Sequence, residues 1–491
     1  MAAVGIFQHL RNYASAGMFS AVVGLVSFPV LTRNLSVAEY GIVGLISSSL
    51  TLCIAFGKLG VQHAVIRFFA QIKNGNIDFT VGQMNSTVSM IFFSFATSAT
   101  ILWLALGFFV LPSLLQYEDI SSLFLLASAI VFIRLLGSGV MNFLRAQQRS
   151  ADVAISQSIA RFLNLALILI VLFAGSLDAW SVIACLLVAE AMGVFYAAWQ
   201  YRPDFRFRLN EVSVKLGKAM LVYGLPLMML ESLGLVLRLS DRYLIEALLG
   251  VDSLGQYSAS YNLTSYIDII IIAALMQSLR PAYMQIWESQ GKGSTQQFLS
   301  GGFRMYMVVG IPFIAMFSIT SPYLLGFLAG EKYSPGTIII PYVAISFWLE
   351  GAMHFLAAGL YIFKNTKLLM LWSLVATVIN LSLNIVLIPI FGITGAAVVT
   401  IISYVVFMIG VTGSAFRYVT FPVSFKAPAI MLLASLLVFS VLSAIDLHTD
   451  VANFLGKGVI GTSILLVLML FVDPEIKQWS RDKLLARTRW V

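Results

Sequence analysis

The chain has 491 residues, of which 59% are hydrophobic and only 11% are charged. Soluble globular proteins carry about 25% charged residues, so this composition excludes a soluble domain and indicates an all-α protein that crosses the membrane many times. The net charge of +8 is explained by the bias of Lys and Arg toward cytoplasmic loops, and no nucleic-acid partner is expected.

The chain lacks the signals of a secreted or metal-binding protein. Residues 1–9 have no basic start of a signal peptide, and the first apolar run, 13–31, is long enough to span a bilayer. Cys53 and Cys185 both fall in apolar runs, which argues against a disulfide or a thiolate metal site. The four histidines show no ligand spacing, so we expect neither a metal nor a cofactor.

Apolar runs of about 20 residues, each long enough to cross a bilayer, predict about fourteen membrane-spanning helices. The eleventh and twelfth are divided by residues 391–395, which follow Pro389 and contain two glycines, a pattern that predicts a tight turn. In chain order, the predicted spans are 12–32, 41–66, 82–112, 120–144, 154–175, 179–200, 219–240, 255–280, 303–328, 337–362, 368–390, 393–416, 428–446 and 455–472.

The positions of the basic residues support this count of spans. With the N-terminus in the cytoplasm, most of the 30 Lys and Arg residues fall in cytoplasmic loops and in the C-terminal tail. This alternation predicts a multi-pass protein of the cell inner (cytoplasmic) membrane with both termini in the cytoplasm. No loop has room for a soluble catalytic domain and no nucleotide-binding loop is present, so we expect neither an enzyme nor ATP-driven transport by this chain.

A weak internal repeat suggests how the spans are grouped. The short outside loop 35–41 resembles the loop 249–255, and each enters a span at a glycine. Two six-span units related by an axis along the membrane normal are therefore predicted, and halves of this kind often rock about a central site. The predicted organisation is an N-terminal lobe 1–200, a basic cytoplasmic linker 201–218, a C-terminal lobe 219–416, an extra helix pair 417–472 and a basic cytoplasmic tail 473–491.

Residues 221–257 form an apolar stretch with charges inside it. Glu231, Arg238, Asp241 and Arg242 fall on one face if this stretch is helical. A charge in hydrocarbon costs a few kcal/mol or more, so such residues face a bundle interior or a wet cavity. Either Glu231 and Arg238 form a structural ion pair, or Arg238 and Arg242 line a polar path for an anionic substrate.

Further charged residues lie within other predicted spans. Lys58 and Arg161 lie toward the cytoplasmic side, where their side chains can reach the interface, and Arg134 and Glu190 can form a structural pair. Asp268 and Glu350 either couple transport to protons or Na⁺ or act as counter-charges. A water-filled, partly cationic cavity is the simplest common cause of so many charges. Arginine suits a phosphate, because its planar fork donates two parallel hydrogen bonds.

Several motifs resemble those of a known family. They are FPVLTRNLSVAEYG at 28–41, KLGV at 58–61, DRYLI at 241–245, LGQYS at 254–258 and FGITGA at 391–396. Together with the number of spans and the basic loop at the midpoint, they are similar to polysaccharide-export flippases of the Wzx type. These belong to the multidrug/oligosaccharidyl-lipid/polysaccharide exporter superfamily, which also contains MATE drug antiporters and MurJ-type lipid II flippases.

The resemblance implies two six-helix lobes arranged in a V, two extra C-terminal helices, a central cavity and alternating access. It implies a cargo of oligosaccharide on undecaprenyl pyrophosphate, moved from the cytoplasmic to the outer leaflet for O-antigen or exopolysaccharide synthesis, and polymerase or ligase enzymes as partners. On this reading Arg238, Arg242, Arg134, Lys58 and Arg161 bind the pyrophosphate. Glu231, Asp268, Glu350 and Glu190 then serve ion coupling, to H⁺ or Na⁺, or act as counter-charges.

Two other functions are alternatives. An ion-coupled drug antiporter needs a cavity dominated by acid to hold organic cations; the buried arginines argue against it, whereas Asp268 and Glu350 favour it. A MurJ-like lipid II flippase shares the same fold and the same headgroup chemistry. A membrane polymerase or glycosyltransferase would carry a sizeable outside loop with paired carboxylates or basic clusters, and the sequence has none.

Overall fold

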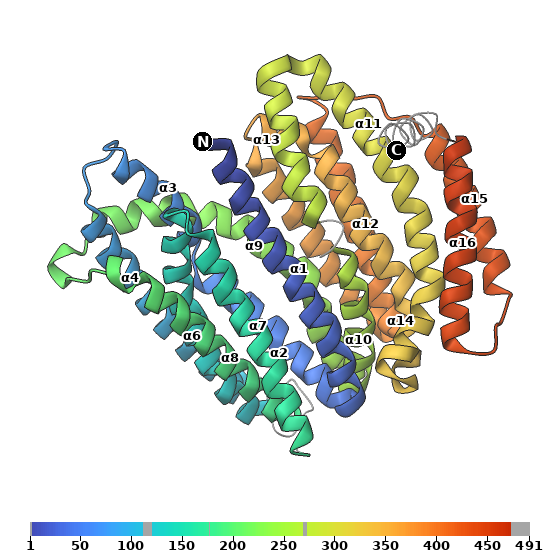
Figure 1. Cartoon of the computed structure of the whole chain (residues 1–491), viewed down its shortest axis with the longest axis horizontal. Coiled ribbons are helices and arrows are strands. Elements are labelled where there is room, and N and C mark those ends of the chain that lie inside the picture. Colours follow the sequence, from blue (N-terminus) through green and yellow to red (C-terminus); the bar gives the residue numbers. More distant parts are fainter. Residues whose placement is uncertain (1, 111–119, 176, 269–272, 473–491) are drawn as a thin grey trace, which may run out of the picture. The chain divides into compact units, whose positions relative to one another are not determined.

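The computed structural model describes residues 2–110, 120–175, 177–268 and 273–472, and every regular element in these ranges is a helix (Figure 1). The all-α class predicted from the sequence is therefore confirmed. The predicted tail 473–491 lies outside the described residues. Contacts between the helices group the chain into two compact units, Met1–Ser258 and Ala259–Val491, and each is described by itself.

The first unit is a bundle in which neighbouring helices pack closely: α6 lies against α4 and α8, and α7 lies against α8 and α1. Its elements are α1 (Ala2–Asn34), α2 (Val37–Gly57), α3 (Val61–Lys73), α4 (Val81–Ala105), η1 (Leu106–Val110), α6 (Ile120–Ala146), α7 (Ser150–Phe173), α8 (Ala179–Tyr201), η2 (Arg202–Asp204), η3 (Leu209–Glu211), α9 (Val214–Leu249) and the start of α10 (Val251–Ile267).

In the second unit, helices α15 and α16 both pack against α11. Lys457 of α16 is fully buried there, and its Nζ donates a 2.7 Å hydrogen bond to the Tyr323 hydroxyl of α11. The elements of this unit are the rest of α10, then α11 (Ala273–Ala329), η5 (Glu331–Ile339), α12 (Ile340–Leu356), α13 (Ala358–Ile362), α14 (Thr366–Ala415), α15 (Lys426–Ser443) and α16 (Asp450–Val472).

Glycine turns interrupt two of the longest helical stretches. Gly291 in α11 has φ 79°, and Gly392 in α14 has φ 61°, so each stretch is two helices joined at a left-handed glycine. Glycine suits such a turn because it has no Cβ to clash. The turn predicted at 391–395 is confirmed by Gly392.

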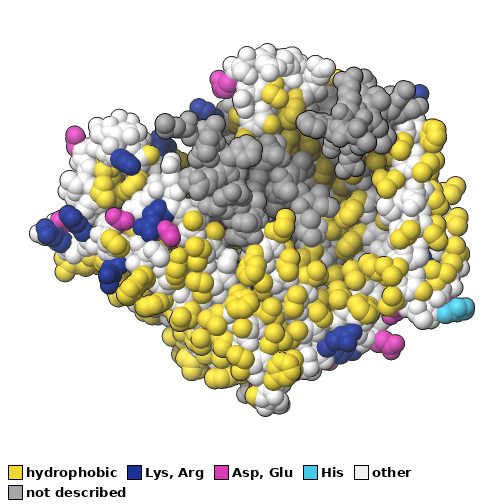
Figure 2. Space-filling model, in the orientation of Figure 1, with side chains coloured by type: hydrophobic (Ala, Val, Ile, Leu, Met, Phe, Trp, Pro, Cys, Tyr) yellow, Lys and Arg dark blue, Asp and Glu magenta, His cyan; other side chains and the backbone are white. Residues whose placement is uncertain are grey.

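The described residues contain 11 helical stretches that are long and apolar enough to cross a membrane. Large apolar side chains are exposed along their outer faces, among them Phe173, Val222 and Leu433, and Figure 2 shows how much of one face they cover. Apolar surface on this scale belongs in lipid, so the chain is a multi-pass membrane protein. The count of about fourteen spans, the membrane orientation and the two lobes arranged in a V stay predictions.

The predicted span 41–66 is wrong at its C-terminal end. Helix α2 ends at Gly57 and α3 begins at Val61, because Leu59 (φ 44°) and Gly60 (φ 74°) are left-handed. A Cβ on Gly60 would lie 1.9 Å from the carbonyl oxygen of Gly224 in α9. The backbones at the start of α3 and in α9 therefore touch at two glycines, and α9 packs against α2, α3 and α4 of the first unit. The predicted division at 201–218 into six-helix lobes stays a prediction.

Candidate functional site

The first unit contains a cavity of about 540 Å³ between α1, α2, α6, α7, α8 and α9. Small polar side chains form part of its wall, including Thr51, Ser138 and Gln157. Six charged residues also line it, four basic and two acidic: Lys58, Arg134, Arg145, Arg161, Glu190 and Glu231.

Helix periodicity brings these side chains to one place. Arg134 and Arg145 both lie on α6, three turns apart, so they share the face that also carries Ser138. Helices α7 and α8 approach closely on the other wall, where the Ser156 hydroxyl donates a 2.6 Å hydrogen bond to the carbonyl oxygen of Gly193. A Cβ on Gly193 would lie 2.9 Å from the backbone carbonyl oxygen of Ser156, so glycine permits this approach.

Arg134 and Glu190 form an ion pair on the cavity wall. The Arg134 Nη2 lies 2.6 Å from Glu190 Oε1, and the two side chains are only 22% and 18% exposed. The pairing that the sequence left open as a structural bridge is thus present. It neutralises one cation and one carboxylate of the cavity.

The second carboxylate, Glu231, contacts α3 rather than its own helix. Its Oε2 accepts a 3.2 Å hydrogen bond from Gln62 Nε2 and lies 3.2 Å from His63 Nε2. Gln62 and His63 follow directly after the left-handed Gly60, so the break between α2 and α3 positions both. Glu231 and Arg238 were one expected pair; the contacts of Glu231 are with Gln62 and His63.

The other three cations of the cavity have no carboxylate within ion-pair distance among the described residues: Lys58, Arg145 and Arg161. Arg145 Nη1 donates a 3.0 Å hydrogen bond to the Asn142 side-chain oxygen. Lys58 and Arg145 are half-buried and Arg161 is exposed. Cations that are gathered in one pocket without counter-charges favour an anion. The cavity is therefore suited to a negatively charged group.

Five of the nine predicted site residues meet in this cavity: Lys58, Arg134, Arg161, Glu190 and Glu231. Arg145 was missed, because the sequence placed it in a cytoplasmic loop after a span ending at 144. Helix α6 continues to Ala146 and carries Arg145 on the same face as Arg134. The spacing of three helical turns between Arg134 and Arg145 was the signal that could have identified Arg145 as a site residue.

Arg242 lies elsewhere in the first unit, between α9 and α2. It is 6% exposed, and its Nη1 donates a 2.6 Å hydrogen bond to the Ser48 hydroxyl. Beside it, the buried carboxylate of Asp241 accepts a hydrogen bond from the Tyr257 hydroxyl. These contacts join α2, α9 and α10 through polar groups away from the cavity lining.

The remaining predicted site residues are not part of this cavity's lining. Arg238 is partly buried in α9, one helical turn beyond Leu235, which does line it. Asp268 and Glu350 belong to the second unit, where the Tyr404 hydroxyl donates a 3.0 Å hydrogen bond to Glu350 Oε2. The binding or coupling roles expected for these three residues, and for Arg242, stay predictions.

The two glycines of the internal repeat lie against each other. A Cβ on Gly41 would lie 2.9 Å from the Val251 carbonyl oxygen, and a Cβ on Gly255 would lie 2.0 Å from the Val37 carbonyl oxygen. Val37 and Val251 occupy matching positions of the repeat, so the contact is reciprocal. Reciprocal contacts of this kind mark a local two-fold relationship between the starts of α2 and α10.

The fold is shared with solved membrane transporters. The chain is similar to a lipid II flippase MurJ in an inward closed conformation, with a TM-score of 0.78 and 14% identity over 94% of this chain and 99% of that one. It is also similar to an inward-facing multidrug resistance MATE family transporter of the MOP superfamily, with a TM-score of 0.66 and 13% identity over 83% of this chain and 98% of that one. At these identities the likeness establishes the fold alone.

The chain is also similar in sequence to a polysaccharide transport protein. The chain is 24% identical, over 331 residues, to the succinoglycan biosynthesis transport protein ExoT of Rhizobium meliloti (strain 1021). The match covers 65% of this chain and 62% of ExoT. The family described as polysaccharide biosynthesis protein matches residues 11–287, more than half of the chain, and the chain belongs to that family.

Proposed function

We propose that this protein is a flippase that moves an oligosaccharide linked to undecaprenyl pyrophosphate from the cytoplasmic to the outer leaflet. The observation that carries this proposal is the cavity of the first unit, where Lys58, Arg145 and Arg161 lack carboxylate partners among the described residues. A pyrophosphate offers several oxygens to such donors, and arginine binds them with paired hydrogen bonds. The polyprenyl tail stays in lipid.

The size and polarity of the cavity agree with such a headgroup. Its volume of about 540 Å³ falls in the range of roughly 300–1,000 Å³ that holds small molecules in proteins. This is room for a diphosphate and the first sugars of an oligosaccharide. Thr51, Ser138 and Gln157 supply hydroxyl and amide groups for sugar hydroxyls.

The transport cycle that fits this proposal is alternating access in the cell inner membrane, with both termini in the cytoplasm. We propose that the close packing of Gly41 against Gly255 keeps the starts of α2 and α10 together during the cycle. Glu231 and Glu190, with Asp268 and Glu350 of the second unit, are proposed to couple the cycle to H⁺ or Na⁺ or to balance cationic charge. Polymerase or ligase enzymes would consume the delivered cargo.

A drug antiporter fits the cavity less well. Organic cations need acidic partners, and both cavity carboxylates are already engaged, Glu190 by Arg134 and Glu231 by Gln62 and His63. A lipid II flippase uses the same headgroup chemistry, so the cavity charges do not separate it from an oligosaccharide flippase. The lipid that accumulates when transport stops does separate the two.

The test is deletion of the gene followed by extraction of lipid-linked sugars. We expect an undecaprenyl-linked oligosaccharide to accumulate on the cytoplasmic side and surface polysaccharide to disappear. Arg161→Gln should fail to restore export, whereas Lys73→Gln, a change at an exposed basic residue at the end of α3, should restore it. Unchanged lipid-linked pools with intact surface polymer would refute the proposal, and accumulation of lipid II would identify the other cargo.

A further inference from the structure

The loop between α8 and α9, residues 202–213, is fastened along its backbone to α4. We call this loop the strap. Three consecutive, fully buried side chains of α4 form hydrogen bonds with its backbone. The Asn85 side-chain amide donates a 2.9 Å hydrogen bond to the Asp204 carbonyl oxygen. The Ser86 hydroxyl accepts a 3.0 Å hydrogen bond from the Arg208 N–H, and the Thr87 hydroxyl accepts a 2.9 Å hydrogen bond from the Ser213 N–H. The strap is therefore fixed to the bundle rather than free in solution.

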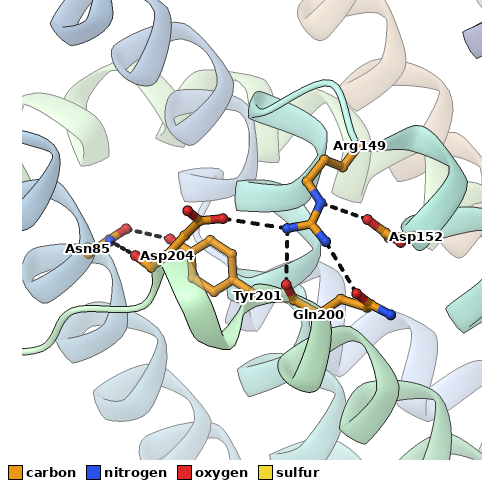
Figure 3. Close-up of polar contacts among 6 residues, drawn as sticks. All are labelled: Asn85, Arg149, Asp152, Gln200, Tyr201 and Asp204. Carbon is orange, nitrogen blue, oxygen red and sulfur yellow. Dashed lines mark hydrogen bonds and ion pairs between the residues drawn. The ribbon is translucent and has the colours of Figure 1, made fainter.

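A second set of contacts anchors the start of the strap (Figure 3). Arg149, between α6 and α7, lies with its Nε 2.7 Å from Asp152 and with its Nη1 3.5 Å from Asp204. The same Nη1 donates a 3.0 Å hydrogen bond to the Gln200 carbonyl. Arg149 thus joins α7, the end of α8 and the start of the strap.

The side chains of the strap point outward and mix aromatic with basic groups. Every residue from 202 to 210 is exposed. Phe205 is 49% exposed, Phe207 42% and Leu209 71%, and they alternate with Arg206 and Arg208. Exposed apolar side chains on a fixed backbone indicate a partner that covers them.

The flanking residues indicate that this partner is the membrane surface. Trp199, near the end of α8, is exposed, and the Arg202 guanidinium lies 4.6 Å from its ring centre. Tryptophan at the end of a spanning helix is typical of the membrane–water boundary. Val214, the first residue of α9, is 82% exposed, and the next exposed positions on that helix include Lys215.

The charge of this region is strongly positive. Five basic residues lie on or next to the strap: Arg202, Arg206, Arg208, Lys215 and Lys218. Its two carboxylates are engaged, since Asp204 contacts Arg149 and Glu211 lies 3.4 Å from Arg208. Figure 2 shows Lys and Arg side chains gathered at one end of the first unit.

We propose that the strap is a lipid-binding element, whose aromatic side chains enter the membrane interface and whose arginines bind headgroups of anionic phospholipids. Basic residues beside aromatic ones bind anionic membranes by combining charge attraction with apolar burial. The contacts of Asn85, Ser86, Thr87 and Arg149 hold the backbone, so the strap meets the lipid preformed. This inference does not depend on the identity of the cargo.

The experiment places a fluorescent label on the strap of the full-length protein in lipid nanodiscs. Cys53→Ser and Cys185→Ala remove the native thiols, and Phe207→Cys carries the label. A matched control label is attached at His448→Cys, an exposed residue of the turn between α15 and α16. The nanodiscs contain phosphatidylcholine alone or a 3:1 mixture with phosphatidylglycerol, each with a spin-labelled lipid or with aqueous acrylamide as quencher.

We expect the Phe207 label to be quenched by spin-labelled lipid and to be protected from acrylamide. Quenching should rise at least twofold with phosphatidylglycerol, and 0.5 M salt or Arg206→Gln with Arg208→Gln should remove that rise. Equal acrylamide access at positions 207 and 448 would overturn the proposal. Protection from acrylamide without quenching by lipid would also overturn it, because it would identify a protein as the cover. A label at Leu209→Cys repeats the test if Phe207→Cys fails to fold.

Discussion

Arg134 of α6 and Glu190 of α8 meet at 2.6 Å on the wall of the cavity. This pair leaves Lys58, Arg145 and Arg161 as the cations of the cavity without a carboxylate partner among the described residues. We propose different roles for the pair and for the three other cations: the pair joins two helices, and the three cations would supply the charge for an anionic ligand.

Replacing the two partners of the Arg134–Glu190 pair should affect different properties, protein stability for Arg134 and ligand binding for Glu190. Arg134→Gln should destabilise the protein by about 1–3 kcal/mol, because it leaves a partly buried carboxylate without its charge partner. Glu190→Gln should instead strengthen binding of an anionic ligand, because it releases the Arg134 charge into the cavity. Thermal unfolding and ligand titration measure the two effects. The double variant should recover most of the stability; if it is as unstable as Arg134→Gln, the pair does not carry the effect.

Glu231 is predicted to weaken anion binding by its own charge. Its carboxylate lines the cavity, with Gln62 and His63 as its hydrogen-bond partners. Glu231→Gln should therefore raise the affinity for farnesyl diphosphate severalfold, since a like charge is removed from a partly desolvated site. Titration calorimetry in nanodiscs measures this, with Glu288→Gln, an exposed residue of α11, as control. A fall in affinity would show that Glu231 positions the ligand instead.

The contact of Gly60 with Gly224 is predicted to be indispensable for the first unit. Gly75 offers a matched control, since Gly60 has φ 74° and Gly75 has φ 71°, but a Cβ would meet Gly224 only at the first position. Gly75→Ala should cost about 1 kcal/mol from backbone strain alone. Gly60→Ala should cost several times more, and size-exclusion chromatography with thermal unfolding measures both. Equal stability of the two variants would contradict this contact.

The turn between α15 and α16 is predicted to depend on pH. A hydrogen bond from the Asn453 side chain, and a second from the His448 N–H, hold the pKa of Asp446 below its usual value. A carboxylate with a lowered pKa contributes stability above its usual pKa, and this contribution is lost as the pH falls through the lower value of the folded state. We therefore expect the His448 amide to lose protection, relative to its intrinsic exchange rate, below about pH 4, and at neutral pH in Asp446→Ala. Unchanged exchange in that variant would contradict the assignment.

Much of the fold could be predicted from the sequence at the places where local signals are strong. Pro389 and the glycines after it identified the turn at Gly392, because these residues interrupt a helix whatever surrounds them. The break between α2 and α3 was missed, since the hydropathy continues through Leu59 and Val61. At that break Gly60 lies against Gly224, and hydropathy along the chain does not reveal a contact between residues so far apart in sequence.

The chemistry of the candidate site was predictable from the sequence, and the Arg134–Glu190 pair was one of the pairings that the sequence left open. Burying charge in a membrane is costly, and this identified Lys58, Arg134 and Arg161 from the sequence. Which cations are neutralised depends on the distance from Arg134 to Glu190, which no local pattern contains. Arg145 was missed because the end of α6 was placed too early by two residues.

We propose that the cations of the cavity bind the pyrophosphate of a lipid-linked cargo. The most direct measurement is the affinity of the purified protein in nanodiscs for farnesyl diphosphate, compared with uncharged farnesol. We predict that the wild type binds the diphosphate and not the alcohol, and that Arg145→Gln and Arg161→Gln each weaken binding about tenfold or more, with Lys73→Gln unchanged. Equal binding by all three variants and the wild type would contradict the account.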